Sequence, residues 1–217
     1  RQHQIRDDLL TVGLDLVRPV RSVRDLGIFL DSDSSMRTNV TRTVASCFAV
    51  LRQIRNISRS VSRLVLQPLI VSLVFSRLDY GSATLAGLPT RLLDRLQSVL
   101  NAAARLVYGS RKYDHVTSFL LDLHWVRVPK RIAFRLAMLV YRCQHGVAPS
   151  YLAKELHRVA DVESWQRLRS AASITALVVP KTVHSTIGDC SFCVSAARVW
   201  NSLSPLVTWS PSLSVFR

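Results

Sequence analysis

The sequence is poor in carboxylates: it has 14 Asp and Glu against 29 Lys and Arg, and its only glutamates are Glu155 and Glu163. Polymerases, nucleases and kinases hold divalent metal ions with clustered carboxylates. The one adjacent pair, Asp7 and Asp8, lacks the apolar strand that would position a metal site, so we expect a solvated turn there. The sequence therefore predicts neither catalytic residues nor a metal site in this chain.

Long hydrophobic runs and a disulfide framework are also absent. The most apolar run covers the thirteen residues 64–76, which is too short to span a bilayer, and no signal peptide precedes it. The four cysteines do not have the spacing of a small secreted domain, which favours a reducing compartment. Cys47 and Cys143 fall on apolar helical stripes, so we expect both in the core.

Cys190 and Cys193 make half of a zinc site at most. His184 precedes them, but no second Cys or His pair follows at a useful spacing, and two small buried hydrophobic residues explain the pair as well. His115 and His124 each have an aspartate nearby. Because the sequence offers no partner nucleophile and no glycine-rich phosphate loop, we expect these histidines to be surface or capping residues.

The cationic excess lies in the middle of the chain. Residues 1–33 carry a net charge of −1, residues 34–154 a net charge of +14, and residues 155–217 a net charge of +2. Of the 29 basic residues, 25 are arginine, whose planar guanidinium binds phosphate through two parallel hydrogen bonds. An arginine-rich codon usage would give the same count. One basic module is therefore the candidate for binding a polyanion.

Hydrophobic periodicity predicts a mainly α fold that opens with short strands, which we expect at 15–17 and 22–30. In residues 91–107, apolar residues recur every three or four positions, with Thr90 as a possible N-cap and Gly109 as the end of the helix. Ser34 or Ser35 is a possible cap for the first helix, and Pro68 should kink its helix or mark its first turn. The first helix is expected around an apolar stripe that runs from Val40 to Ile54. Further helices are expected over about 60–80 and 91–107, to about 123, from 129 to an end at Gly146, over 149–159 and over 190–203, where Pro205 stops the last one. An extended piece is expected at 177–179.

Basic side chains lie off these apolar stripes and are candidate nucleic-acid contacts. Such a surface neutralises phosphates and binds in a salt-sensitive, sequence-tolerant way. A solvated charged face is the alternative, and a membrane-surface role is less favoured because helix packing accounts for the apolar faces. Trp125 and Tyr141 are expected in the core, whereas Tyr108 and Tyr113 also interleave with the basic residues. The candidates are Arg37, Arg42, Arg52, Arg55, Arg59, Arg91, Arg95, Arg105, Arg111, Lys112, Lys130, Arg131, Arg135 and Arg142.

Six stretches together resemble the C-terminal region of LINE-type (non-LTR) retrotransposon reverse transcriptases of the Jockey-like superfamily. They occur in the same order as in that family and together run over nearly all of the chain. They are VRDLGIFLDSDSSM (23–36), SRLDYGSATLAGLP (76–89), DRLQSVLNAAARLV (94–107), DHVTSFLLDLHWVRVPKRIAFRLAMLVYRCQHGVAPSYL (114–152), RLRS (167–170) and VWNSLSP (199–205).

The resemblance implies a division into the end of the palm with its primer-grip strands (1–33), a basic helical thumb (34–145) and a mixed, mostly helical C-terminal extension (146–217). It implies an RNA-directed DNA polymerase as parent, with an RNA template, a DNA primer or target and the remainder of the polyprotein as partners. Neither a membrane nor a small-molecule substrate is implied. The family's catalytic aspartates and their Mg²⁺ belong to an upstream palm, so this chain alone should be inactive. The parent element would act inside the cell, in nucleus and cytoplasm.

The chain departs from the family pattern in places. Gly81 and Ser82 replace a usual Cys-Asn, Cys190 replaces a common arginine, and Pro68 interrupts a family helix. The first methionine, Met36, lies inside an expected helix, so we expect a piece of a longer protein. The alternative function is a non-enzymatic helical protein-interaction module derived from a retrotransposon remnant.

Overall fold

The computed structural model describes residues 8–161, 175–182 and 188–216, and these residues form two compact units. Unit 1 comprises residues 1–78 and 90–114, and unit 2 comprises residues 79–89 and 115–217. This division by spatial contact differs from the functional division at residues 33 and 145, which stays a prediction. Asp7, Glu163, His184 and the RLRS stretch lie outside the described residues.

The chain begins with two antiparallel hairpins, as the strand-like start of the sequence predicts. The first joins β1 (Leu10–Val12) to β2 (Asp15–Val17), and the second joins β3 (Ser22–Asp25) to β4 (Ile28–Asp31). The stretch expected to be strand over 22–30 is therefore broken in its middle. Leu26 and Gly27 both have positive φ values, 44° and 85°, as a tight two-residue hairpin turn requires.

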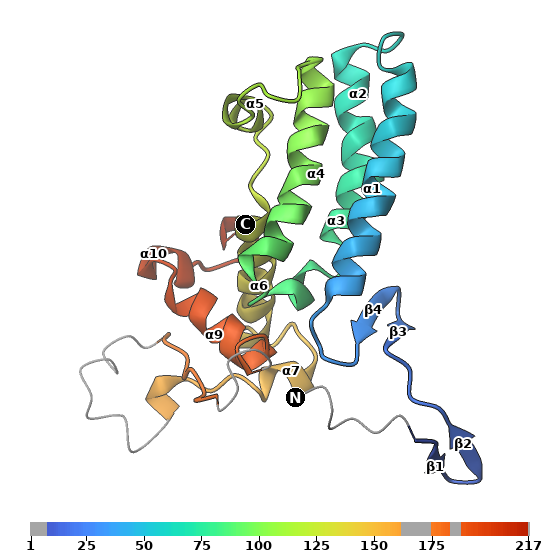
Figure 1. Ribbon diagram of the computed structural model, residues 1–217. Coiled ribbons are helices and arrows are strands. Elements are labelled where there is room, and N and C mark those ends of the chain that lie inside the picture. The colour runs from blue at the N-terminus through green and yellow to red at the C-terminus, as the bar shows by residue number, and fades with distance from the viewer. Residues whose placement is uncertain (1–7, 162–174, 183–187, 217) are drawn as a thin grey trace. The chain divides into compact units, whose positions relative to one another are not determined.

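Long helices form the rest of unit 1 and run side by side in Figure 1. They are α1 (Arg37–Ile57), α2 (Arg63–Ile70), the π-helical turn η2 (Val71–Phe75), α3 (Ser76–Asp79), whose last residue belongs to unit 2, and α4 (Thr90–Tyr108). Each long segment buries the apolar stripe that the sequence predicts, and the side chains at its centre are almost fully buried. These include Val40, Cys47, Ile70, Val74, Leu96, Leu100 and Ala103.

The helix expected over 60–80 is present, and of the two roles expected for Pro68, a kink or the first turn, the first turn is wrong. Pro68 is inside α2, and the following turn widens into the π-helical segment Val71–Phe75. Proline has no backbone N–H, so Pro68 removes one hydrogen bond from the helix, and a π-bulge is one way for a helix to accommodate that loss. The Cys47 thiol lies 3.9 Å from the Val74 carbonyl oxygen in this turn.

Two helix ends follow the glycines that the sequence marks. Gly109 and Gly146 have left-handed φ values of 62° and 69°. Beyond them, the Ser110 N–H donates to the Arg105 carbonyl at 3.0 Å and the Val147 N–H donates to the Arg142 carbonyl at 2.9 Å. Both ends are Schellman motifs, which confirms the predicted C-terminal boundaries.

Unit 2 is built around α6 (Val128–Gln144). Its other elements are η3 (Ser82–Leu85), α5 (Thr117–Asp122), α7 (Ser150–Ala153), η4 (Val159–Asp161), α9 (Phe192–Asn201), α10 (Pro205–Thr208) and α11 (Leu213–Phe216). Side chains of α6, α9 and α11 share one core, in which Tyr141, Trp200 and Phe216 meet. The core positions expected for Trp125 and Tyr141 are confirmed, at 7% and 3% exposure.

Two helix predictions in unit 2 are wrong in their bounds. The helix expected over 149–159 ends at Ala153, and a β-bridge between Arg158 and Leu177 then replaces helical hydrogen bonding. Pro205 does not simply stop a helix: α9 already ends at Asn201, and Pro205 is the first residue of α10. Proline suits that position because the first helical N–H has no intrahelical acceptor.

Candidate nucleic-acid interface

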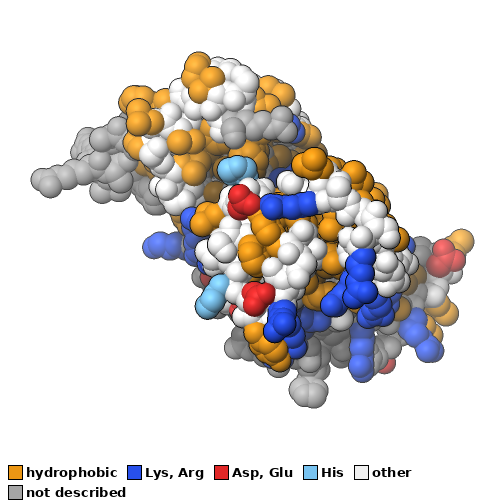
Figure 2. Space-filling view, turned by 90° about the horizontal axis from the view of Figure 1, so that it is seen from above, with side chains coloured by type: hydrophobic (Ala, Val, Ile, Leu, Met, Phe, Trp, Pro, Cys, Tyr) orange, Lys and Arg blue, Asp and Glu red, His pale blue; other side chains and the backbone are white. Residues whose placement is uncertain are grey.

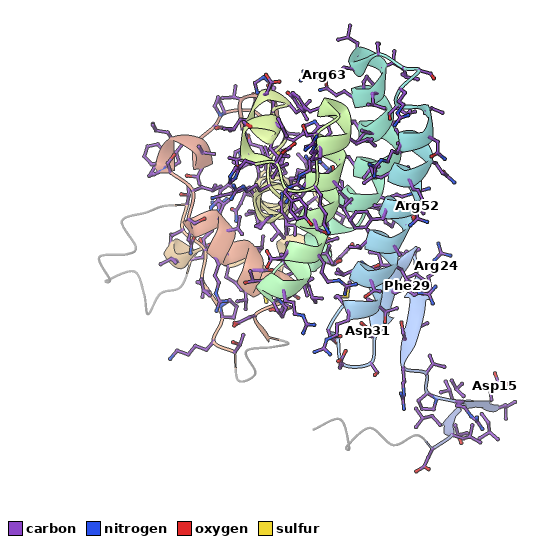
Figure 3. The ribbon with its side chains drawn as sticks, turned by 45° about the horizontal axis from the view of Figure 1, so that its top comes forward. Asp15, Arg24, Phe29, Asp31, Arg52 and Arg63 are labelled. Atoms are coloured by element: carbon purple, nitrogen blue, oxygen red, sulfur yellow. The ribbon has the colours of Figure 1, made fainter. Side chains whose placement is uncertain are left out.

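The first helix carries four of the candidate arginines and no acidic residue. Arg37, Arg42, Arg52 and Arg55 are all exposed. The Arg42 guanidinium lies over the Phe29 ring, 4.3 Å from its centroid, and the Arg24 guanidinium lies 5.7 Å from the same centroid. Figure 3 shows Arg24 and Phe29 beside the start of α1. One candidate, Arg42, is thus held against the β3–β4 hairpin by a cation–π contact.

The candidates on α4 differ in how freely they meet solvent. Arg91 is exposed, whereas Arg95 is half-buried and donates to the Thr41 hydroxyl of α1 at 3.0 Å. Arg105 is half-buried and donates to the Asp114 carbonyl at 3.1 Å. The guanidinium groups of these two arginines, which would have to donate to a phosphate, already donate hydrogen bonds within unit 1 and stabilise its fold.

The loop after α4 adds two exposed cations and an exposed ring. Arg111 and Lys112 are exposed, and the Lys112 ammonium lies 5.8 Å from the centroid of Tyr113, which is itself 88% exposed. The other interleaved tyrosine, Tyr108, is covered by the Arg63 guanidinium, 3.8 Å from its ring centroid. No local pattern in the sequence marks Arg63, because its aromatic partner lies 45 residues further along the chain.

Arg131 and Arg135 of α6 share one carboxylate. Arg131 Nε donates to Asp79 Oδ1 at 3.0 Å and its Nη2 pairs with Asp79 Oδ2, to which Arg135 Nη2 also donates at 3.2 Å. The Arg131 and Asp79 side chains are 23% and 17% exposed, but Arg135 is 52% exposed. Arg131 is therefore chiefly an internal partner, whereas Lys130 and Arg142 of the same helix are exposed.

Basic side chains prevail on the helical part of unit 1. Residues 37–78 and 90–114 contain twelve Lys and Arg but only Asp94 and Asp114 as acidic residues. Figure 2 looks onto the end of the bundle where α1 ends and α2 begins, and Lys and Arg side chains gather there toward the right of the view. Unit 1 thus brings together Arg37, Arg42, Arg52, Arg55, Arg59, Arg91, Arg95, Arg105, Arg111 and Lys112, while Lys130, Arg131, Arg135 and Arg142 belong to unit 2.

Two of the four cysteines behave as packing residues, whereas Cys190 and Cys193 are partly exposed. All four are free thiols, and Cys47 and Cys143 are buried, as predicted. Burial raises the pKa of the Cys47 thiol to about 11 and also raises the pKa of Cys143, which disfavours the nucleophilic thiolate. Burial and the nearby Asp189 carboxylate raise the pKa of Cys190. Among the described residues, no three His, Cys, Asp or Glu side chains come together as metal ligands.

Comparison with known proteins adds no relative. No family model, no curated protein and no solved structure matches the chain. None of the helices in the described ranges combines the length and hydropathy needed to cross a membrane. The resemblance to non-LTR reverse transcriptases therefore rests on the six sequence stretches.

Proposed function

We propose that the chain is the thumb end of a non-LTR retrotransposon reverse transcriptase, and that unit 1 binds the duplex of RNA template and DNA primer. The observation that supports this most is the surplus of basic side chains in the helical part of unit 1, where residues 37–78 and 90–114 contain twelve basic residues and only two acidic ones. Duplex phosphates attract such a surface, and binding releases condensed counterions. The order of the six family-like stretches supports the same assignment.

In this proposal the chain holds nucleic acid and does not perform the polymerase chemistry. The parent polyprotein would supply the palm aspartates and the Mg²⁺ that nucleotide transfer needs. The apolar stripes of α1, α2 and α4 pack the bundle, which leaves their basic sides free to follow the backbone of a duplex. Binding of this kind has little sequence preference, because phosphate contacts carry no base information.

Fluorescence anisotropy with the full chain and a labelled RNA/DNA hybrid of about 20 base pairs tests the proposal. The association constant should fall steeply between 50 and 200 mM salt, by about 10³-fold or more if six phosphates are neutralised. Single-stranded RNA and duplex DNA of the same length serve as competitors. Binding that is independent of salt, or no binding at low salt, would contradict the proposal.

A second candidate is a protein-interaction module, which apolar exposure in unit 2 favours. Leu206 and Trp209 of the α10 region are 86% and 65% exposed. An open apolar groove of about 400 Å³ is lined by residues that include Leu120, Leu121 and Trp125. Heparin separates the two functions, because it should displace nucleic acid but leave an apolar protein contact nearly unchanged.

A further inference from the structure

The candidate cations divide into two groups according to what their side chains already contact. Arg95, Arg105 and Arg131 donate hydrogen bonds within the fold, and Arg42 covers an aromatic ring. The side chains of a second group are exposed and have no hydrogen-bond, ion-pair or ring partner among the described residues. Within unit 1 this group consists of Arg37, Arg52, Arg55, Arg59, Arg91 and Arg111.

Three members of the second group follow one another at the C-terminal end of α1 and in the turn beyond it. Arg52 and Arg55 are three residues apart, and Arg59 follows four residues later in the turn that extends the helix. The turn is closed by hydrogen bonds that reach three residues back: the Ser58 N–H donates to the Arg55 carbonyl and the Ser60 N–H donates to the Ile57 carbonyl. Spacings of three and four place side chains on one side of a helix. Figure 3 shows Arg52 on the outer side of α1.

The neighbouring side of this helix segment packs in the core. Leu51 and Ile54 are 6% and 3% exposed and pack inside the bundle, which fixes the rotation of α1 about its axis. The helix has no acidic residue to compensate its arginines, and its only aromatic residue, Phe48, is half-buried. This surface can therefore supply positive charge to a ligand but no stacking platform for bases.

The length of the row matches a nucleic-acid strand. At about 1.5 Å of rise per residue, Arg52 and Arg59 are separated by about 10 Å along the helix axis. One strand of a duplex presents about one phosphate per 3.4 Å of its axis, which gives about three phosphates over this length. Guanidinium groups bind phosphate oxygens through paired hydrogen bonds.

We infer that Arg52, Arg55 and Arg59 form a phosphate-contact row that binds consecutive phosphates of one strand of the duplex. This inference rests on the proposed function and makes it specific, because it separates contact residues from arginines that stabilise the fold. Arg95, Arg105 and Arg131 are then positioning residues, whose side chains hold the helices and loops in place. The row recognises the charge and the spacing of the phosphates and does not recognise the base sequence.

The test compares three full-length variants with the unchanged chain on the same RNA/DNA hybrid. The slope of log K against log salt is negative, and R52Q/R55Q/R59Q should reduce its magnitude by two to three units, since each lost phosphate contact removes about 0.9. R52K/R55K/R59K keeps the charge and should keep the slope, with weaker binding because lysine lacks the fork geometry. R18Q/K154Q/K181Q removes the same charge from exposed positions outside the candidate set and should leave the slope within about half a unit.

Each outcome bears on the inference. An unchanged slope for R52Q/R55Q/R59Q overturns the phosphate-contact row but leaves the proposal of duplex binding intact. An equal loss in R18Q/K154Q/K181Q also overturns it, because binding would then depend on net charge alone. Absence of salt-dependent binding by the unchanged chain overturns both the row and the proposed function. If R52Q/R55Q/R59Q loses its helical circular dichroism, the single variants R52Q and R55Q are tested instead. Each must then reduce the magnitude of the slope by about one unit.

Discussion

The carboxylate of Asp31, at the end of β4, accepts a hydrogen bond from the backbone N–H of Thr38 at 3.0 Å and so caps the start of α1. The Ser35 hydroxyl donates to the same oxygen at 3.3 Å. The serine cap predicted for this helix is wrong: the N-cap residue is Met36, in a left-handed conformation, and no side chain of its own caps the helix. The cap comes instead from the preceding strand.

Asp31 makes the stability of unit 1 depend on pH. Burial raises the pKa of its carboxyl, but the hydrogen bonds from Thr38 and Ser35 outweigh burial, so the pKa lies below its ordinary value of 3.8. A carboxyl whose pKa is lower in the folded than in the unfolded state contributes stability at pH values above the unfolded-state pKa. This contribution is lost as the pH falls through the folded-state pKa. We expect Asp31→Ala to reduce the free energy of unfolding by about 1 kcal/mol at pH 7.

Urea denaturation of Asp31→Ala and the unchanged chain at pH 7 and pH 3 measures this effect. The difference should shrink at pH 3, where the carboxyl of the unchanged chain is losing its charge. Asp31→Asn is the matched control, because asparagine also caps helices and should keep most of the stability at both pH values. A difference that is the same at pH 7 and pH 3 would show that the charge of Asp31 has no part in it.

Arg131 and Arg135 should differ in what their removal costs. Arg131→Ala leaves the half-buried Asp79 without its two-bond partner and should lower the free energy of unfolding by about 2 kcal/mol. Arg135→Ala removes an exposed, longer contact and should cost less than about 0.5 kcal/mol. Thermal unfolding of the two variants compares them directly, and equal losses would contradict the difference in burial.

Gly87 should tolerate no side chain. It has a φ of 75°, and a Cβ atom there would lie 2.7 Å from the Asp189 carbonyl oxygen, which is backbone and cannot swing aside. Gly109 has a similar φ of 62°, but nothing lies within 4 Å of its Cβ position. We expect Gly109→Ala to cost about 1 kcal/mol from backbone strain alone and Gly87→Ala clearly more. A melting temperature for Gly87→Ala that is equal to or above that of Gly109→Ala would contradict the close approach.

The four thiols should react in an order set by burial. Cys190 and Cys193 are partly exposed, whereas Cys47 is almost fully buried with a pKa raised to about 11. Iodoacetamide at pH 8 should therefore modify Cys190 and Cys193 in the native protein while Cys47 reacts only after unfolding. Peptide mass spectrometry over a time course shows the order. Early modification of Cys47 would mean that the bundle opens readily.

Features encoded within one or two helical turns could be predicted from the sequence. The apolar stripe of residues 91–107 and the glycines at 109 and 146 are local signals, and the helices and Schellman ends follow from them. The exposure of most candidate arginines was predictable for the same reason, since residues off a buried stripe face solvent. Even the core positions of Trp125 and Tyr141 follow from the pattern.

Only the tertiary structure decides which polar groups meet across long stretches of chain. Asp79 and Arg131 are 52 residues apart, and Arg63 and Tyr108 are 45 apart, so no spacing rule pairs them. The sequence by itself determined a basic, mainly helical chain, because periodicity and charge are properties of composition and order. Packing of the helices determined which arginines stabilise the fold and which, such as Arg52, meet solvent without a partner among the described residues, because a side chain's partners depend on what lies beside it in space.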